Sequence, residues 1–302
     1  MKNIPMSLRS RPWISLWVAV IVGTVILLLA KEWVPWAFKY PRAGQLPFSG
    51  WITTFMKWLI NSADFGLFTF KEFTRSIAWL VEQPYLLVKS LLSTGFLSGV
   101  GSYAQQVFPR ISWVALIAGF MLLGHYSKDW KLSVLAGASF TYLVVFGQWD
   151  SAMVTLSSII IAVPIGILAG LLLGIVGYRS PRFRIVLIPI LDLMQTVPVF
   201  AYLVPILLLF GFSPVSAMIA TIIYAMPPMV RVTMLALSQV SPEVVEAGEM
   251  AGCTRRQLLW RVLLPSAKRS LMLGVNQVVM LSLNMVIIAS MIGAGGLGFD
   301  VL

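Results

Sequence analysis

Cysteine, histidine and acidic residues are all scarce in this sequence. It contains one cysteine, Cys253, which excludes an internal disulfide, and one histidine, His125, which leaves no ligand cluster for a transition metal. Asp and Glu number 11 in 302 residues, and charged residues of both signs make up only 11% of the chain. We therefore expect no metal site, no redox chemistry and no catalytic residues.

The chain is poor in charged residues and rich in apolar ones. The chain is 59% hydrophobic with a mean hydropathy of +0.89, which is more apolar surface than one water-soluble core can hide. The net charge of +11 could indicate nucleic acid, but the basic residues stand in short segments beside apolar runs and form no continuous tail. The sequence therefore predicts an all-α, polytopic membrane protein that contacts membrane lipid and no nucleic acid.

Seven apolar runs are long enough, or nearly long enough, to cross the roughly 30 Å hydrocarbon layer. They lie at 13–30, 111–126, 132–148, 151–177, 185–210, 215–236 and 271–292. Lys and Arg gather in alternate connections, at 128–131, 179–184 and 255–269, whereas 148–150 and 211–214 have none. The positive-inside rule then predicts about seven spans, a cytoplasmic N-terminus and residue 302 outside.

The segment 31–110 has a different pattern, in which Trp, Phe and Leu alternate with charged residues. This pattern is typical of amphipathic helices at the outer interface, which serve either as surface decoration or as a docking surface for an external partner. We expect residues 1–110 to form an N-terminal span plus this interfacial region, and residues 111–302 to form the transmembrane core.

Small residues recur every fourth position at Ala162, Gly166, Gly170 and Gly174, which predicts one helix face that another helix approaches closely. Pro227 and Pro228 are expected to break or bend the sixth span. The glycine-rich string at 293–298 lacks the strand and helix of a phosphate-binding loop, so we expect a turn or an interfacial packing element there.

Polar residues at membrane depth are the candidates for a transport path. Asp192 and Gln195 are three residues apart and share a helix face, and Thr196 follows. Asp192 either lines a polar path or pairs with a neighbouring helix. Asn276 and Gln277 in the last run, with Asn284, either line the same path or join helices by hydrogen bonds.

A polar, basic loop at 241–268 separates the last two apolar runs. Ser241 followed by Pro242 predicts a helix start, and we expect this helix to run to about Ala251 and to stop at Gly252. The loop is therefore predicted to begin with one short helix and to turn at a glycine elbow.

Thr254 with Gln257 three residues later predicts a capping box that opens a second short helix, ending before Pro265. The first helix has an acidic stripe at Glu243, Glu246 and Glu249 beside a small apolar one. Such a helix is either simply solvated or fits the groove of a cytoplasmic partner, with acid for orientation and small residues for close approach.

The same loop carries a motif with fixed gaps: Glu-Ala-Ala, three residues, Gly, nine residues, Ile-x-Leu-Pro. It is matched by Glu246, Ala247, Gly248, Gly252, Val262, Leu264 and Pro265, with Gly and Val replacing the second Ala and the Ile. In this motif the loop resembles the cytoplasmic coupling loop of ATP-binding-cassette import permeases. The segments "LDLMQTVPVFAYLVPILLLFG", "AMPPMVR", "GVNQ" and "MVIIASMIGAGGLG" are similar to permeases for glycine betaine, proline betaine and choline.

This resemblance covers about residues 150–300, and it implies a type I importer permease-like helical bundle in the plasma (inner) membrane of a bacterium. It implies ATPase coupling through the motif residues and Glu243, and import of an osmoprotectant. Family members continue past the glycine string into a further span, which this sequence does not show. The substrate path is expected to include Asp192, Gln195, Thr196, Phe200, Tyr202, Asn276 and Gln277.

The resemblance implies a transport subunit and no enzyme. The sequence contains no Gly-Lys dipeptide and hence no Walker A lysine, so we expect no bound cofactor, with ATP and Mg used by a separate cytoplasmic ATPase. An external or periplasmic substrate-binding protein and a second copy of the permease are the other expected partners. The alternative is an ion-coupled secondary transporter of small solutes.

Overall fold

The computed structural model describes residues 12–31, 47–64, 66, 68–98, 105–290 and 295–300. The basic residues before residue 12, residues 293 and 294 of the glycine string, and residue 302 lie outside this range. The chain divides into two compact units, Met1–Ala63 and Asp64–Leu302.

The first unit contains two helices. α1, Pro12–Leu29, has no charged residue and matches the first predicted apolar run. α2, Phe48–Asn61, carries the aromatic pairs Phe48–Trp51 and Phe55–Trp58 on its surface. α2 thus has the aromatic surface expected of an interfacial helix.

The second unit is almost entirely helical. Helix is favoured because an apolar segment in a membrane must satisfy its backbone donors and acceptors internally. Two π-helical turns, η3 and η5, interrupt the α-helices. The elements are α3 Phe70–Lys89, η3 Ser90–Thr94, α4 Trp113–Tyr126, α5 Trp130–Val145, α6 Trp149–Arg179, α7 Pro181–Thr196, α8 Val199–Phe210, α9 Pro214–Ser238, α10 Pro242–Met250, α11 Arg255–Gln257, η5 Leu258–Leu263, α12 Leu264–Ser266, α13 Lys268–Ala289 and α14 Leu297–Asp300.

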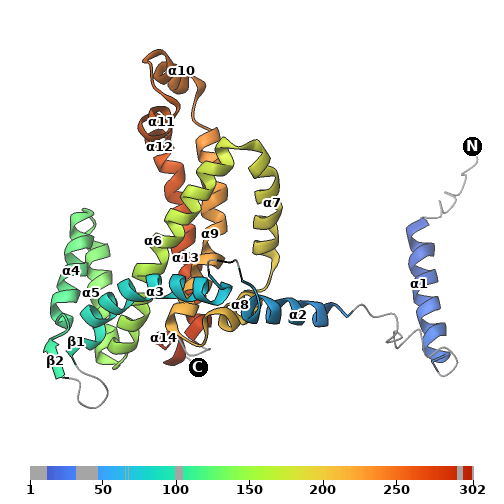
Figure 1. Cartoon of the computed structure of the whole chain (residues 1–302), viewed down its shortest axis with the longest axis horizontal. Helices are drawn as coiled ribbons and strands as arrows, with labels where there is room; N and C mark the ends of the chain where they lie inside the picture. The colour runs from blue at the N-terminus through green and yellow to red at the C-terminus, as the bar shows by residue number, and fades with distance from the viewer. Residues whose placement is uncertain are drawn as a thin grey trace, which may run out of the picture. The chain divides into compact units, whose positions relative to one another are not determined.

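The centre of this unit is formed by α6, α9 and α13, which pack side by side (Figure 1). The small-residue face of α6 makes this packing possible, as predicted. A Cβ atom at Gly170 would lie 2.6 Å from the Met229 Cβ, and one at Gly174 would lie 2.5 Å from the Thr233 Cβ. Both neighbours are on α9, so α6 and α9 approach to a distance that only glycine allows at these positions.

α3 packs against this centre and is more than a surface helix. Its N-terminus has a full capping box, in which Thr69 and Glu72 exchange side-chain and backbone hydrogen bonds. Thr74, Val81 and Tyr85 are buried, and the last two join the apolar cluster with α6, α8 and α9. The predicted boundary at residue 110 stays a prediction, while α3 belongs to the same compact unit as residues 111–302.

A short antiparallel ribbon contains the two strands of the described residues. β1, Phe96–Ser98, pairs with β2, Gln105–Phe108. Arg110, just after the ribbon, donates to the Ser93 carbonyl and forms an ion pair with Asp150 in the first turn of α6. These contacts attach the ribbon to the end of α6.

The prolines of the fifth and sixth apolar runs act in opposite ways. The run at 185–210 is two helices, α7 and α8, bent by 103° because Pro198 disfavours a helical conformation at Val197. α9 instead continues through Pro227 and Pro228 as one helix, so a break there is wrong, while a bend stays a prediction. Buried contacts with α6 and α13 support α9 along this stretch.

Three of the described helices are long and apolar enough to cross a membrane: α6, α9 and α13. The bent pair of α7 and α8 makes a fourth if it counts as one span. Helices α4 and α5 and residues 16–29 of α1 are apolar but shorter. Each predicted apolar run is helical over most of its described residues, and residues 291 and 292 of the last run lie outside them. The count of seven spans stays a prediction.

Candidate functional site

α10 begins the 241–268 loop where the sequence predicted. Ser241 precedes the helix in an extended conformation, and Pro242 takes a first-turn position, where no N–H donor is needed. The backbone N–H of Glu243 and then the Ser241 hydroxyl hold the pKa of the Glu243 carboxyl below its usual value. The ionised acid suits the positive end of the helix dipole. The Ser241 hydroxyl thus interacts with the Glu243 carboxyl by a hydrogen bond and does not cap a backbone N–H of the helix.

The predicted elbow at Gly252 is confirmed. Its φ of 77° lies in the left-handed region, which glycine adopts at little cost. The Gly252 N–H donates to the Glu249 carbonyl at 2.9 Å, and the Cys253 N–H donates to the Gly248 carbonyl at 3.1 Å. These bonds close the last turn of α10 and reverse the chain toward α11.

The second helix begins as predicted and ends later than predicted. The Gln257 N–H donates to the Thr254 hydroxyl at 3.3 Å and the Thr254 N–H donates to the Gln257 side chain at 2.9 Å, which completes the capping box. The chain then continues through η5 and α12 to Ser266, so the expected end before Pro265 is wrong. The π turn restarts the helix at Leu264, and Pro265 takes a first-turn position that needs no donor.

The inner face of the loop is fixed to the helical centre. Gly248 is buried against η5, where an added Cβ would lie 2.7 Å from Leu258 and 3.3 Å from Val262. The Arg179 side chain, at the end of α6, donates to the Arg255 carbonyl at 3.3 Å. The apolar cluster beneath the loop contains Ile175, Ala236, Leu237, Leu259, Leu263 and Ala267, with Leu264 packed at its edge.

The outer face of the loop is exposed and mixes acid with apolar groups. The acids Glu243, Glu246 and Glu249 are exposed, as are Ala247 and Pro265. Met250 is 89% exposed and Trp260 is 51% exposed. Sequence reasoning missed both, because no pattern signals which apolar residue of a short helix faces outward.

Asp192 pairs with a basic residue that sequence reasoning also missed. Its carboxylate forms an ion pair with Arg231, which connects α7 to α9. The pairing with a neighbouring helix is thus observed, and a place for Asp192 in a polar path stays a prediction. The signal was present in the sequence, since Arg231 is a lone charge inside an apolar run, where ionisable residues usually have a partner or a function.

The other polar candidates of the fifth run lie near the α7–α8 bend. Gln195 and Thr196 are exposed in the last turn of α7, and Phe200 on α8 is 55% exposed. The Tyr202 hydroxyl donates to the Met194 carbonyl across the bend, and its ring meets that of Tyr224 edge-on. Tyr202 therefore holds the bend against α9.

Asn276 and Gln277 are exposed on α13, and Asn284 is exposed two turns further along the same helix. α13 packs against α6 and α9, as α7 also does, but no hydrogen bond among the described residues joins the polar groups of α7 to those of α13. The single chain thus does not bring the two sets together. The described residues also contain no group of three or more His, Cys, Asp or Glu that could hold a metal ion.

Known proteins match both the loop and the helices that carry it. The family of binding-protein-dependent transport system inner membrane components matches residues 162–302. A glycine betaine/carnitine transport permease protein of Listeria monocytogenes is 38% identical over 209 residues, which are 68% of this chain and 74% of the relative. The chain belongs to this family of inner membrane components.

Other relatives are longer than the aligned region. A trimethylamine N-oxide transport system permease protein of Ruegeria pomeroyi is 38% identical over 270 residues, 88% of this chain and 39% of the relative. A glycine betaine/proline betaine transport system permease protein of Escherichia coli is 42% identical over 203 residues, 67% of this chain and 57% of the relative. The chain thus spans about two fifths of the first relative and just over half of the second.

Proposed function

We propose that this chain is the membrane permease subunit of an ATP-driven importer for a quaternary-ammonium or betaine-type solute. The observation that carries the proposal is the 241–268 loop, which is packed against the helices on its inner face and exposes acid and apolar groups on its outer face. A partner with a basic-rimmed apolar groove would complement that outer face. Membership of the family supports the same function, because the relatives described above are named as transport permeases.

The loop is built to transmit force. Its apolar cluster includes residues of α6 and α9, and Arg179 bonds it to the end of α6. A movement imposed on α10 would therefore pass into the spans through packed side chains, as in other rigid-body switches. The proposed source of energy is a separate cytoplasmic ATPase that binds ATP and Mg.

The polar faces of α7 and α13 support a second permease copy and a transport path. Gln195, Thr196, Asn276 and Gln277 are exposed in the single chain, although they lie on apolar helices. Polar side chains are costly against lipid, so these faces are better covered by another chain or by a water-filled path. We propose that two copies enclose the path, with one loop for each of two ATPase subunits.

The alternative, an ion-coupled secondary transporter, depends on a carboxylate that is free to bind Na⁺ or H⁺. The Asp192–Arg231 ion pair occupies the acid that best fits that role. The names of the relatives indicate solutes such as betaines, carnitine and trimethylamine N-oxide. A substrate-binding protein on the outer side is the proposed source of substrate specificity.

Reconstitution distinguishes the two mechanisms. Proteoliposomes containing the chain, its cognate ATPase and its binding protein are expected to import radiolabelled glycine betaine, choline or trimethylamine N-oxide only when ATP is enclosed with the ATPase. Imposed Na⁺ and H⁺ gradients serve as the comparison. Uptake driven by a gradient in the absence of the ATPase would replace the proposed mechanism with the ion-coupled one.

The proposed orientation places the N-terminus in the cytoplasm and the 241–268 loop on the same side. Single cysteines at Ser266, which is exposed, and at Phe212, which is 81% exposed, are suitable probes in a Cys253→Ala background. An impermeant thiol reagent is expected to label the first only from the cytoplasmic side and the second only from outside. The reverse pattern would invert the orientation.

A further inference from the structure

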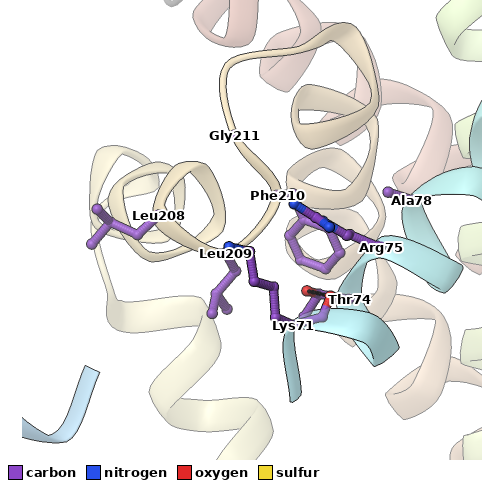
Figure 2. A pocket seen from close by; sticks show the side chains of 8 residues that line it. All are labelled: Lys71, Thr74, Arg75, Ala78, Leu208, Leu209, Phe210 and Gly211. Atoms are coloured by element: carbon purple, nitrogen blue, oxygen red, sulfur yellow. Dashed lines mark hydrogen bonds between the residues drawn. The ribbon is translucent and has the colours of Figure 1, made fainter. Parts of the chain in front are cut away.

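A cavity of about 250 Å³ lies between the start of α3 and the end of α8 (Figure 2). It is smaller than the roughly 300–1,000 Å³ of drug-sized ligand pockets, so it suits a small solute. Its lining residues are Lys71, Thr74, Arg75 and Ala78 from α3, and Leu208, Leu209, Phe210 and Gly211 from the end of α8.

The α3 wall of the cavity is positively charged. Lys71 and Arg75 are four residues apart and face the same side, and Figure 2 shows their charged ends reaching toward the α8 residues. Neither forms an ion pair among the described residues. The neighbouring acid, Glu72, interacts electrostatically with Arg75, but it accepts from the Thr69 N–H at 2.8 Å and does not line the cavity. The two cations are thus available to an anionic oxygen.

The α8 wall carries no charged side chain and is formed by the C-terminal end of a helix. α8 ends at Phe210, and Gly211 turns away with a φ of 80°. The last carbonyls of a helix lack intrahelical partners and carry partial negative charge. Together with the Phe210 ring, this end suits a trimethylated cation, which has no N–H to donate and binds to carbonyl oxygens and aromatic faces.

The cavity also lies at the far end of α9 from the 241–268 loop. Gly211 lies three residues before α9 begins, and the loop begins three residues after α9 ends. α9 has 25 residues, which is about 37 Å at 1.5 Å per residue and enough to cross a bilayer. In the proposed orientation the cavity therefore opens on the outer side, where solute arrives.

We propose that this cavity is a low-affinity receiving site for a small dipolar solute, with its anionic oxygen held by Lys71 and Arg75 and its trimethylated cation at the end of α8. The assignment rests on the proposed function for the direction of transport and for the betaine-type cargo. A plain cation such as choline would meet two positive side chains, and a plain anion would meet the negative end of α8. Only a solute with both poles is complementary to both walls.

Direct binding tests the site in the purified full chain. We would place it in nanodiscs of phosphatidylethanolamine, which carries no trimethylammonium group, and measure saturation transfer to the methyl protons of glycine betaine, trimethylamine N-oxide and choline. Glycine betaine and trimethylamine N-oxide are expected to bind and choline is not. A Lys71→Gln/Arg75→Gln variant is expected to bind glycine betaine and trimethylamine N-oxide at least about tenfold more weakly, because two charge-assisted contacts are lost.

Lys89→Gln is the matched control, since Lys89 lies on the same helix but outside the cavity lining, over the Tyr85 ring. It is expected to bind both dipolar solutes like the wild type, and Arg75→Lys is expected to retain binding. Equal binding of choline, or unchanged binding in the double variant, would overturn the site. So would displacement of the solutes by added phosphatidylglycerol, which would identify a lipid headgroup site.

Transport measurements distinguish a failure of the receiving site from a failure of the proposed permease function. If the reconstituted complex imports glycine betaine and the Lys71→Gln/Arg75→Gln variant imports it at the wild-type rate, the receiving site is wrong and the permease function stands. If the purified chain binds glycine betaine through Lys71 and Arg75 but the complex imports none of the three solutes, the proposed function is wrong and the site stands.

Discussion

The 241–268 loop and the polar faces of α7 and α13 differ in how far one chain satisfies them. The loop closes its own helix ends, at Gly252 and in the Thr254–Gln257 box, and buries its inner face on α6 and α9. The polar faces leave Gln195 and Asn276 exposed, without a partner helix among the described elements. The loop is therefore complete as a folded element, whereas the faces require another chain or water to cover them.

Because of this difference, we expect the two regions to tolerate substitutions unequally. A rigid loop that contacts a partner fails when its shape or charge changes, whereas a path that only passes solute loses rate gradually. The loop and the path both depend on α6 and α9, because these two helices connect the two regions.

The largest effect is expected for Gly174→Val on α6. A Cβ there would lie 2.5 Å from the Thr233 Cβ and 2.9 Å from the Val230 carbonyl, so the α9 backbone has to move. Overpacking of this kind typically costs about 1–3 kcal/mol, and here it separates two helices that support the loop and the path together. Transport and ATPase copurification are both expected to be lost.

Gly119→Val on α4 is the control for that variant, because no atom lies within 4 Å of a Cβ at Gly119. Thermal unfolding of the two purified variants would measure the effect. A Gly174→Val protein as stable as Gly119→Val would contradict the close approach of α6 and α9.

The next largest effect is expected in the loop. Gly252→Val places a β-branched residue at a φ of 77°, at a cost of about 1–2 kcal/mol or roughly tenfold in the population of the elbow. Glu246→Lys reverses an exposed charge that we expect to face a basic groove. Transport and ATPase stimulation are expected to fall together, by about tenfold, in both variants.

Gly147→Val imposes the same backbone strain at the other end of α6, since Gly147 has a φ of 72° and no atom within 4 Å of its Cβ position. It is expected to leave ATPase stimulation unchanged. Equal loss in Gly147→Val and Gly252→Val would show that strain anywhere disables the chain, and the special role of the loop would be withdrawn.

A smaller effect is expected on the polar faces. Gln195→Leu and Asn276→Leu should slow transport about threefold, as the loss of one polar contact of about 0.6 kcal/mol in a membrane implies. ATPase assembly and solute capture by the binding protein should stay at wild-type levels. Leu168→Ala, at an exposed apolar position of α6, is the control. Full-rate uptake by both Leu variants would remove these residues from the path.

The sequence predicted the loop well because its signals are local. Pro242, Gly252 and the Thr254–Gln257 pair each act through the backbone within a few residues, so their spacing alone places α10, the elbow and α11. The end of the second helix was wrong because a π turn shifts the helix by one residue, and no local motif specifies that turn.

The path could not be predicted to the same depth. The Asp192–Arg231 ion pair joins residues 39 apart on two helices, and the 103° bend between α7 and α8 sets which polar groups lie near each other. Likewise the amphipathic pattern of α3 did not predict that Tyr85 is buried in the core. Such contacts follow from tertiary packing, which the pattern of one segment does not contain.

The smallest effect is expected for the Ser241 hydroxyl beside Glu243. The Glu243 N–H is the larger cause of the lowered pKa of this carboxyl and the Ser241 hydroxyl is the second, so Ser241→Ala should raise that pKa only part of the way toward its usual value of 4.5. A lowered folded pKa means that the ionised acid stabilises α10 above the usual value and that this contribution is lost as pH falls through the lowered one. Carbon-13 NMR of the glutamate carboxyls would follow the titration, with Ser238→Ala as the control because that hydroxyl bonds the Leu235 carbonyl within α9. An unchanged Glu243 titration in Ser241→Ala would mean that the backbone N–H alone lowers the pKa of this carboxyl. The start of α10 would then depend on its backbone and not on the Ser241 side chain.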